Sequence, residues 1–201
     1  MLAAQQVAVR PLSESLLQDV VRIHKEGLGY TLNSRLGTTH LGFLYETMAR
    51  DSTSFVGVAM VKGCVAGIIS GTLHEDRLKS AILESMSARQ KAGLATRLLL
   101  RPWLMLQWLQ SVIIALPAYY EAQEVHAVLT ALAVDPKYQG RGVGVQLIHS
   151  LEAFFGANKV GSYRLDTLAT NHHALKFYGT LGFTEVARRA GSVILVRTMG
   201  Q

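Results

Sequence analysis

The stretch that decides the fold reads Val134-Asp135-Pro136-Lys137-Tyr138-Gln139-Gly140-Arg141-Gly142-Val143-Gly144. An apolar run over residues 125–134, typical of a buried strand, precedes the turn, and apolar residues at helical spacing over 144–155 follow it. Three glycines within five residues let the backbone adopt positive φ and approach a ligand, while the N–H groups at a helix start attract an anion. We therefore predict a strand-turn-helix unit that cradles an anion such as a pyrophosphate. The alternative is a tight turn that binds nothing.

The turn resembles the acetyl-CoA signature of the GCN5-related N-acetyltransferases (GNAT family), Q/R-x-x-G-x-G/A, filled here by Gln139, Gly142 and Gly144. It matches neither the nucleoside-triphosphate loop nor the dinucleotide motif, because the glycine spacing differs and no Lys-Ser/Thr pair follows. One helix and one strand downstream, residues 171–183 resemble the family block Asn-x-x-Ala-x-x-x-Tyr-x-x-x-Gly-Phe. The resemblance is clear over residues 125–199, and the order of elements before it is compatible.

The rest of the chain predicts one mixed α/β domain. Strands are expected over 7–12, 54–61, 64–73, 125–134, 163–168 and 192–198. The first helix is expected to start at Ser13 or Ser15 and to end near Gly27 or Gly29, and a loop is expected over 27–37. Further helices are expected over 36–49, 80–116, 144–155 and 172–181. The resemblance implies a mostly antiparallel central sheet flanked by helices, a GNAT-like acyl-CoA N-acyltransferase fold. Residues 1–201 are expected to form a single domain with a helical insertion at about 77–120.

Composition excludes several classes of protein. A chain of 201 residues with 49% hydrophobic and 17% charged residues is long and apolar enough for one packed domain and too apolar for a disordered one. Its single cysteine, Cys64, allows neither an intrachain disulfide nor a cysteine zinc cluster, and the first 25 residues lack an apolar signal core. His172 and His173 could suggest a metal site, but neighbouring side chains on a helix point about 100° apart, and no partner cluster with ligand spacing appears. We expect a cytoplasmic protein without a metal site.

The net charge of +6 favours anionic ligands, and most of the excess lies in residues 77–101. The remainder is nearly balanced, which argues against a nucleic-acid groove. The uncharged stretch 102–120 carries polar residues on one helical face and Pro117, which argues against a transmembrane span. We predict a helix packed on the core or on a partner subunit in a homodimer. Peripheral membrane contact through Trp103 and Trp108 is the alternative.

The resemblance implies how acetyl-CoA is bound. The strand before the turn splays from its neighbour, and the pantetheine arm lies in the cleft against main-chain groups of Leu132 and Val134. The N–H groups of the turn hold the pyrophosphate, with the charge of Arg141 nearby or simply solvated. Asn171 contacts the arm by its amide or caps the following helix. The cofactor-binding residues so implied are Leu132, Val134, Gln139, Gly140, Arg141, Gly142, Val143, Gly144 and Asn171.

Acyl transfer from a thioester to an amine needs a neutral nucleophile, a stabilised oxyanion and a protonated leaving thiol. The resemblance makes Tyr178 the acid that protonates the CoA thiolate, and a core aromatic is the alternative role. For the general base, His126 and Glu124 at the start of the splayed strand are the candidates, with His74 third.

The sequence therefore predicts an enzyme that moves an acetyl group from acetyl-CoA to a primary amine of a small molecule, such as an amino sugar or an amino acid derivative. A protein or peptide amine is the second acceptor class. The competing function is a non-catalytic acyl-CoA-binding or membrane-peripheral interaction module.

Overall fold

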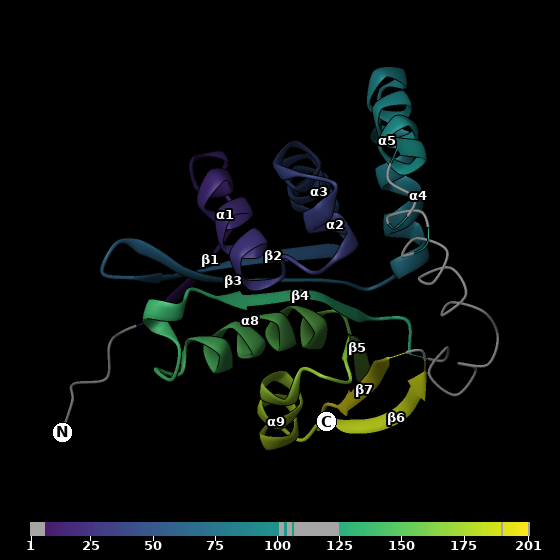
Figure 1. The fold of residues 1–201 in the computed structure, drawn as a ribbon. Coiled ribbons are helices and arrows are strands. Elements are labelled where there is room, and N and C mark those ends of the chain that lie inside the picture. The colour runs from purple at the N-terminus through teal and green to yellow at the C-terminus, as the bar shows by residue number, and fades with distance from the viewer. Residues whose placement is uncertain (1–6, 101–102, 104–105, 107–124, 190, 201) are drawn as a thin grey trace.

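The computed structural model describes residues 7–100, 103, 106, 125–189 and 191–200. Within them, a seven-stranded sheet has the order β1-β2-β3-β4-β5-β7-β6 (Figure 1). The elements are β1 (Ala8–Pro11), η1 (Glu14–Leu16), α1 (Leu17–Gly27), α2 (Leu32–Arg35), α3 (Thr38–Arg50), β2 (Ser54–Val61), β3 (Cys64–Thr72), α4 (Glu75–Ser85), α5 (Ala88–Leu100), β4 (Val128–Val134), η3 (Pro136–Tyr138), α8 (Val143–Ala157), β5 (Ser162–Leu168), α9 (His172–Thr180), β6 (Thr184–Arg189) and β7 (Ser192–Thr198).

Helices cover both faces of this sheet, which gives the predicted mixed α/β fold (Figure 1). On one face, α1 and α3 bury a core that includes Val20, Leu41 and Ile68. On the other, α8 buries a second core around Leu147 and Phe155. Helices α4 and α5 stand at one end of the sheet, on the same side as α1 and α3 (Figure 1).

Strands β2 and β3, predicted over 54–61 and 64–73, form an antiparallel hairpin. Val61 pairs with Cys64, and the two residues between them, Lys62 and Gly63, have φ of 49° and 80°. Two consecutive left-handed residues form the type I′ turn whose twist matches that of the flanking strands. Local sequence alone is sufficient to determine this unit.

Several expected boundaries were wrong. The expected loop over 27–37 contains α2, whose four residues are too short to show a helical period. The edge strand β6 was missed because its sequence, Thr-Glu-Val-Ala-Arg-Arg, has few apolar residues. The strand expected from residue 125 begins at Val128, and the helical stretch expected over 80–116 begins at Glu75 and breaks between α4 and α5. Most of its second half lies outside the described residues.

The middle of the sheet opens between β4 and β5, as the resemblance implies. β4 pairs with β3 over most of its length, but it pairs with the parallel strand β5 at a single position, Val128 with Arg164. A bulge between Ser70 and Gly71 leaves Thr130 of β4 without a partner in the register. Bulges bend and twist a strand, so β4 leaves β5 just after the shared position.

The layer of α1 and α3 buries a polar pair. His24 is 4% exposed and Tyr45 is 1% exposed, and Nδ1 of His24 lies 2.6 Å from the phenol oxygen of Tyr45. Burial lowers the pKa of His24 to about 4 and raises the pKa of Tyr45. Both side chains are therefore uncharged at neutral pH.

This burial predicts a loss of stability in weak acid. Unfolded His24 takes a proton near pH 6.5, whereas folded His24 stays neutral until about pH 4, so the unfolded state binds more protons between these values. The free energy of unfolding should fall by about 3 kcal/mol as the pH drops from 6.5 to 4. Urea unfolding of the wild type and of His24→Gln checks this. Equal slopes of stability against pH in the two proteins would contradict it.

Candidate active site

The glycine turn joins the open edge of β4 to the start of α8. Gly140 and Gly142 have φ of +71° and +77°, and a Cβ added at either would meet no atom within 4 Å. The backbone conformation therefore demands glycine there, and open space lies over the turn. Gly144 differs, because its added Cβ would lie 3.1 Å from the ring of Phe177. That glycine lets α8 and α9 pack closely.

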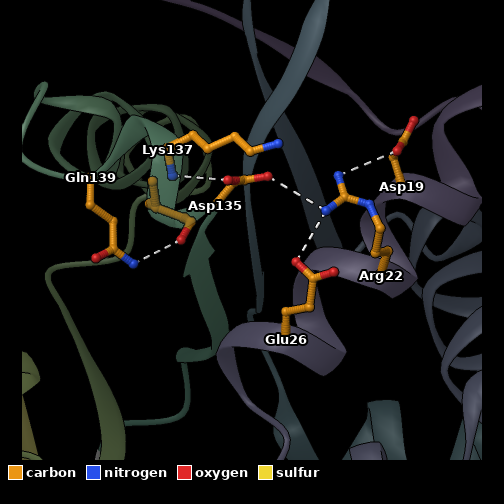
Figure 2. A network of polar contacts seen from close by, with 7 residues as sticks. Asp19, Arg22, Glu26, Asp135, Lys137 and Gln139 are labelled. Carbon is orange, nitrogen blue, oxygen red and sulfur yellow. Dashed lines mark hydrogen bonds and ion pairs between the residues drawn. The ribbon is translucent and has the colours of Figure 1, made fainter.

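Polar contacts fix the first part of the turn (Figure 2). The carboxylate of Asp135, 8% exposed, accepts the main-chain N–H of Lys137 at 3.0 Å and pairs with Arg22 of α1 at 3.5 Å. Arg22 also contacts Asp19 at 3.5 Å and Glu26 at 3.1 Å. Sequence reasoning missed this link between α1 and the turn. The Asp-Pro pair signals a capping aspartate, but nothing local points to Arg22 as its partner.

The side chain of Gln139 closes the turn over the end of β4. Its amide donates to the carbonyl oxygen of Val134 at 3.0 Å (Figure 2). The N–H of Asp135 bonds to Ala66 of β3, so by antiparallel alternation the main-chain groups of Leu132 and Val134 point away from β3. They point toward the space that opens between β4 and β5. The carbonyl of Val134 is already used by Gln139, so its N–H is the group directed to that space.

The start of α8 has the electrostatics of an anion site. α8 is 15 residues long, its first turn contains no acidic residue, and its N-cap, Gly142, makes no side-chain cap bond. The first N–H groups of a helix lack intrahelical partners and carry a partial positive charge. The exposed Arg141, whose guanidinium carbon lies 6.0 Å from the ring centre of Tyr138, adds a full charge on the turn. The structure thus places the charge of Arg141 beside the N–H groups of Gly142, Val143 and Gly144 at the start of α8.

Tyr178 lies in the core cluster on the α8 face. It is 7% exposed, and its ring contacts Phe177 and Phe183 edge-on, with centroids 5.3 and 5.1 Å away. Burial raises its pKa, and the nearby Tyr30 raises it further. Tyr178 is therefore a neutral phenol at physiological pH. Its helix starts at Asn171, whose side-chain oxygen accepts the N–H of Ala174 at 3.1 Å.

The base candidates lie at the opposite end of β4 from the turn. His126 and His74 are both exposed, and their ring centroids are 6.2 Å apart. Glu124 lies outside the described residues. Beside the histidines, Glu75 pairs with Lys79 at 2.8 Å and with Arg164, and these cations lower its pKa against the effect of burial. Sequence reasoning missed this charged group because its members are far apart in the chain.

Metal sites and membrane spans are both absent from the residues that the structure describes. No group of three or more His, Cys, Asp or Glu side chains could hold a metal ion there. No helix in that part of the chain is both long and apolar enough to cross a membrane. Trp103 and Leu106 are 57% and 61% exposed, and Trp108 lies outside the described residues.

Residues 108–183 match the acetyltransferase (GNAT) family. Among solved structures, the chain is similar to the PaiA N-acetyltransferase of Thermoplasma acidophilum in complex with coenzyme A (13% identity, TM-score 0.63, 96% of this chain and 99% of that one). It is also similar to the ribosomal-protein-S18-alanine N-acetyltransferase of Escherichia coli (15%, 0.59, 98% and 96%) and to Ard1 of Thermoplasma volcanium (18%, 0.60, 97% and 99%). No curated protein matches the sequence.

Proposed function

We propose that this protein transfers the acetyl group of acetyl-CoA to a primary amine of a small molecule. Residues 108–183 match the GNAT acetyltransferase family, and the fold is similar to those of solved acetyltransferases. The observation that carries the proposal is the single paired position between β4 and β5, after which β4 continues to the glycine turn and the start of α8. We infer a cleft where the two strands part. A flexible arm fits such a cleft, and a pyrophosphate fits the helix start. The similar PaiA structure contains coenzyme A.

In this reaction the main-chain groups of Leu132 and Val134 bind the pantetheine arm, and the turn from Gln139 to Gly144 binds the pyrophosphate. The side chain of Gln139 shapes the turn, since it bonds to the carbonyl of Val134. Asn171 uses its oxygen to cap α9, which leaves its amide nitrogen for the arm. The role of each of these residues is part of the proposal.

The chemistry is direct transfer. The amine nitrogen forms a bond to the thioester carbon, the carbonyl oxygen becomes an oxyanion, and the oxyanion collapses as the carbon–sulfur bond breaks. The CoA thiolate takes the proton of the Tyr178 hydroxyl, and the nitrogen of the new amide loses one proton to a base. The base returns that proton through solvent, and Tyr178 is reprotonated.

Burial has two effects on Tyr178 as an acid. It keeps the phenol protonated before transfer, and by raising its pKa it makes the phenol a weaker donor. The leaving thiolate is a charge in the same apolar surroundings, so its proton affinity rises as well. Proton transfer between the two groups therefore remains feasible, because one charge replaces another in the same place.

His126 is the proposed base, with His74 beside it and Glu124 as the alternative. The two rings are exposed, and their centroids are 6.2 Å apart. Water chains between an exposed ring and the cleft can carry the proton.

The first test is a thermal titration with acetyl-CoA, CoA and pantetheine. A ligand at about 100 times its dissociation constant stabilises the native state by about 2.7 kcal/mol, so acetyl-CoA and CoA should both raise the melting temperature. Pantetheine, which lacks the phosphates, should raise it much less. No shift with either coenzyme would make the turn purely structural and would favour the interaction module.

A screen of amines then defines the acceptor, with release of the CoA thiol as the signal. We propose amino sugars and amino acid derivatives first. Peptide N-termini form the second class, since the similar S18 enzyme is by its name an alanine N-acetyltransferase of a ribosomal protein.

We also propose that residues 1–201 form one cytoplasmic domain. The helical insertion at about 77–120 is proposed as a homodimer face or a peripheral membrane contact, since Leu100 and Trp103 are 75% and 57% exposed.

A further inference from the structure

A line of four polar side chains runs from the helical layer through the sheet to the cleft. His24 on α1 contacts Tyr45 on α3, with 2.6 Å between Nδ1 and the phenol oxygen. The Ser70 hydroxyl on β3 acts against the larger effect of burial on the pKa of Tyr45, and its oxygen lies 2.7 Å from the hydroxyl of Thr130 on β4. The first three are at most 4% exposed, whereas Thr130 is exposed.

Thr130 stands where the cleft begins. It is the residue left out of the β3 register by the bulge, two positions after Val128, where β4 and β5 part. Its contact with Ser70 places it on the face of α1 and α3, because Ile68, two residues before Ser70, belongs to that core. Tyr178 belongs to the core on the opposite face. A thioester in the cleft would therefore have the acid on one side and Thr130 on the other.

A carboxylate lies on the same face of the neighbouring strand. Tyr163 and Leu165 of β5 point into the α8 core, so Asp166 points to the face of α1 and α3 by strand alternation. Asp166 is two residues past the position that β5 shares with β4, and Arg164 contacts its carboxylate at 3.4 Å. Thr130 and Asp166 thus flank the opening from its two strands, and their oxygens suit an amine.

One direction of hydrogen bonding along the line fits the distances. At 2.6 Å, the contact between His24 and Tyr45 is shorter than an ordinary N–H···O bond and fits an O–H donor, so the phenol donates to Nδ1. With the phenol O–H donating to Nδ1, the phenol oxygen can accept from Ser70, and Ser70 can accept from Thr130, since either hydroxyl of that pair can donate. The oxygen of Thr130 consequently presents lone pairs, and no proton, to the cleft.

The other ring nitrogen of His24 indicates that this residue has a role other than stabilising the fold. Nε2 is buried and has no hydrogen-bond partner in the described part of the chain. Buried polar atoms without partners are rare and destabilising, so stability alone does not favour histidine at this place. The imidazole of His24 instead supplies an acceptor, Nδ1, for the hydroxyl of Tyr45.

We propose that Thr130 Oγ1 accepts a hydrogen bond from the N–H of the amine acceptor, and that His24, acting through Tyr45 and Ser70, is a positioning residue that sets this polarity. The bond turns the nitrogen lone pair toward the thioester carbon. No proton moves along the line. The inference rests on the proposed function and adds the site of its nucleophile.

A kinetic double-mutant cycle tests the coupling. Thr130→Val should lower kcat about tenfold, the effect of one hydrogen bond, while Thr130→Ser should keep most activity. Tyr45→Phe should lower kcat similarly, and the double variant Tyr45→Phe/Thr130→Val no further. KM for acetyl-CoA should be unchanged in all. The matched control is Thr47→Val on α3, which loses a bond to the carbonyl of Phe43 but has no place in the line.

Two results would overturn the inference: an unaltered kcat in Thr130→Val, or losses that multiply in the double variant. A measurement without substrate gives an independent answer. In the wild type, the nitrogen spectrum of labelled histidine should show neutral His24 with its proton on Nε2, and a proton on Nδ1 would reverse the line and refute the proposal. Absence of coenzyme binding would instead contradict the proposed function, whatever the tautomer.

Discussion

Gly142→Glu is expected to abolish measurable binding of CoA and acetyl-CoA. Gly142 is the N-cap of α8, and open space surrounds the Cβ that the change would add, so the carboxylate enters the place proposed for the pyrophosphate. Two unit charges 4 Å apart at an effective dielectric constant of about 20 repel by about 4 kcal/mol. Affinity should thus fall by about 100-fold or more, measured by calorimetric titration.

Gly142→Gln is the matched control for this change. Both side chains have the same size and impose the same strain at a φ of +77°, so they should lower the melting temperature equally. The difference in coenzyme affinity between the two variants then isolates the charge. Unchanged affinity in Gly142→Glu would remove the pyrophosphate from this turn.

Tyr178→Phe is expected to lower kcat by about 100-fold or more, the usual contribution of a general acid. The ring keeps its contacts with Phe177 and Phe183, so the apolar packing of α9 should be preserved. Affinity for acetyl-CoA should be nearly unchanged, because the hydroxyl acts on the sulfur only as the bond breaks. Single-turnover kinetics and coenzyme titration measure the two quantities separately.

Tyr163→Phe provides the matched control. Tyr163 belongs to the same core cluster, its ring touches Phe183, and its hydroxyl donates to Glu152 at 2.9 Å. Its loss should reduce stability and leave kcat intact. A normal kcat in Tyr178→Phe, or a large loss of affinity with normal chemistry, would make Tyr178 a core aromatic rather than the acid.

The features that the sequence predicted correctly are local. The hairpin of β2 and β3, the strand before the turn and helix α8 each carry their signal within about 20 consecutive residues, as alternation, helical spacing or glycine placement. The resemblance to the GNAT family also rests on two short blocks, and residues 108–183 match that family. Element β6 was missed because an edge strand needs few apolar residues to stay paired with β7.

Local sequence determined the glycine turn and carries the resemblance to the GNAT family. The tertiary structure alone decided which distant groups meet: Arg22 meets Asp135 behind the turn, Thr130 meets Ser70, and His24 meets Tyr45. The physical reason is that backbone conformation depends on neighbours in the chain, whereas a contact between α1 and β4 depends on how the helices pack on the sheet. The opening between β4 and β5 also depends on tertiary structure, because it arises from a bulge in the pairing of β3 with β4, two strands about 60 residues apart in the chain.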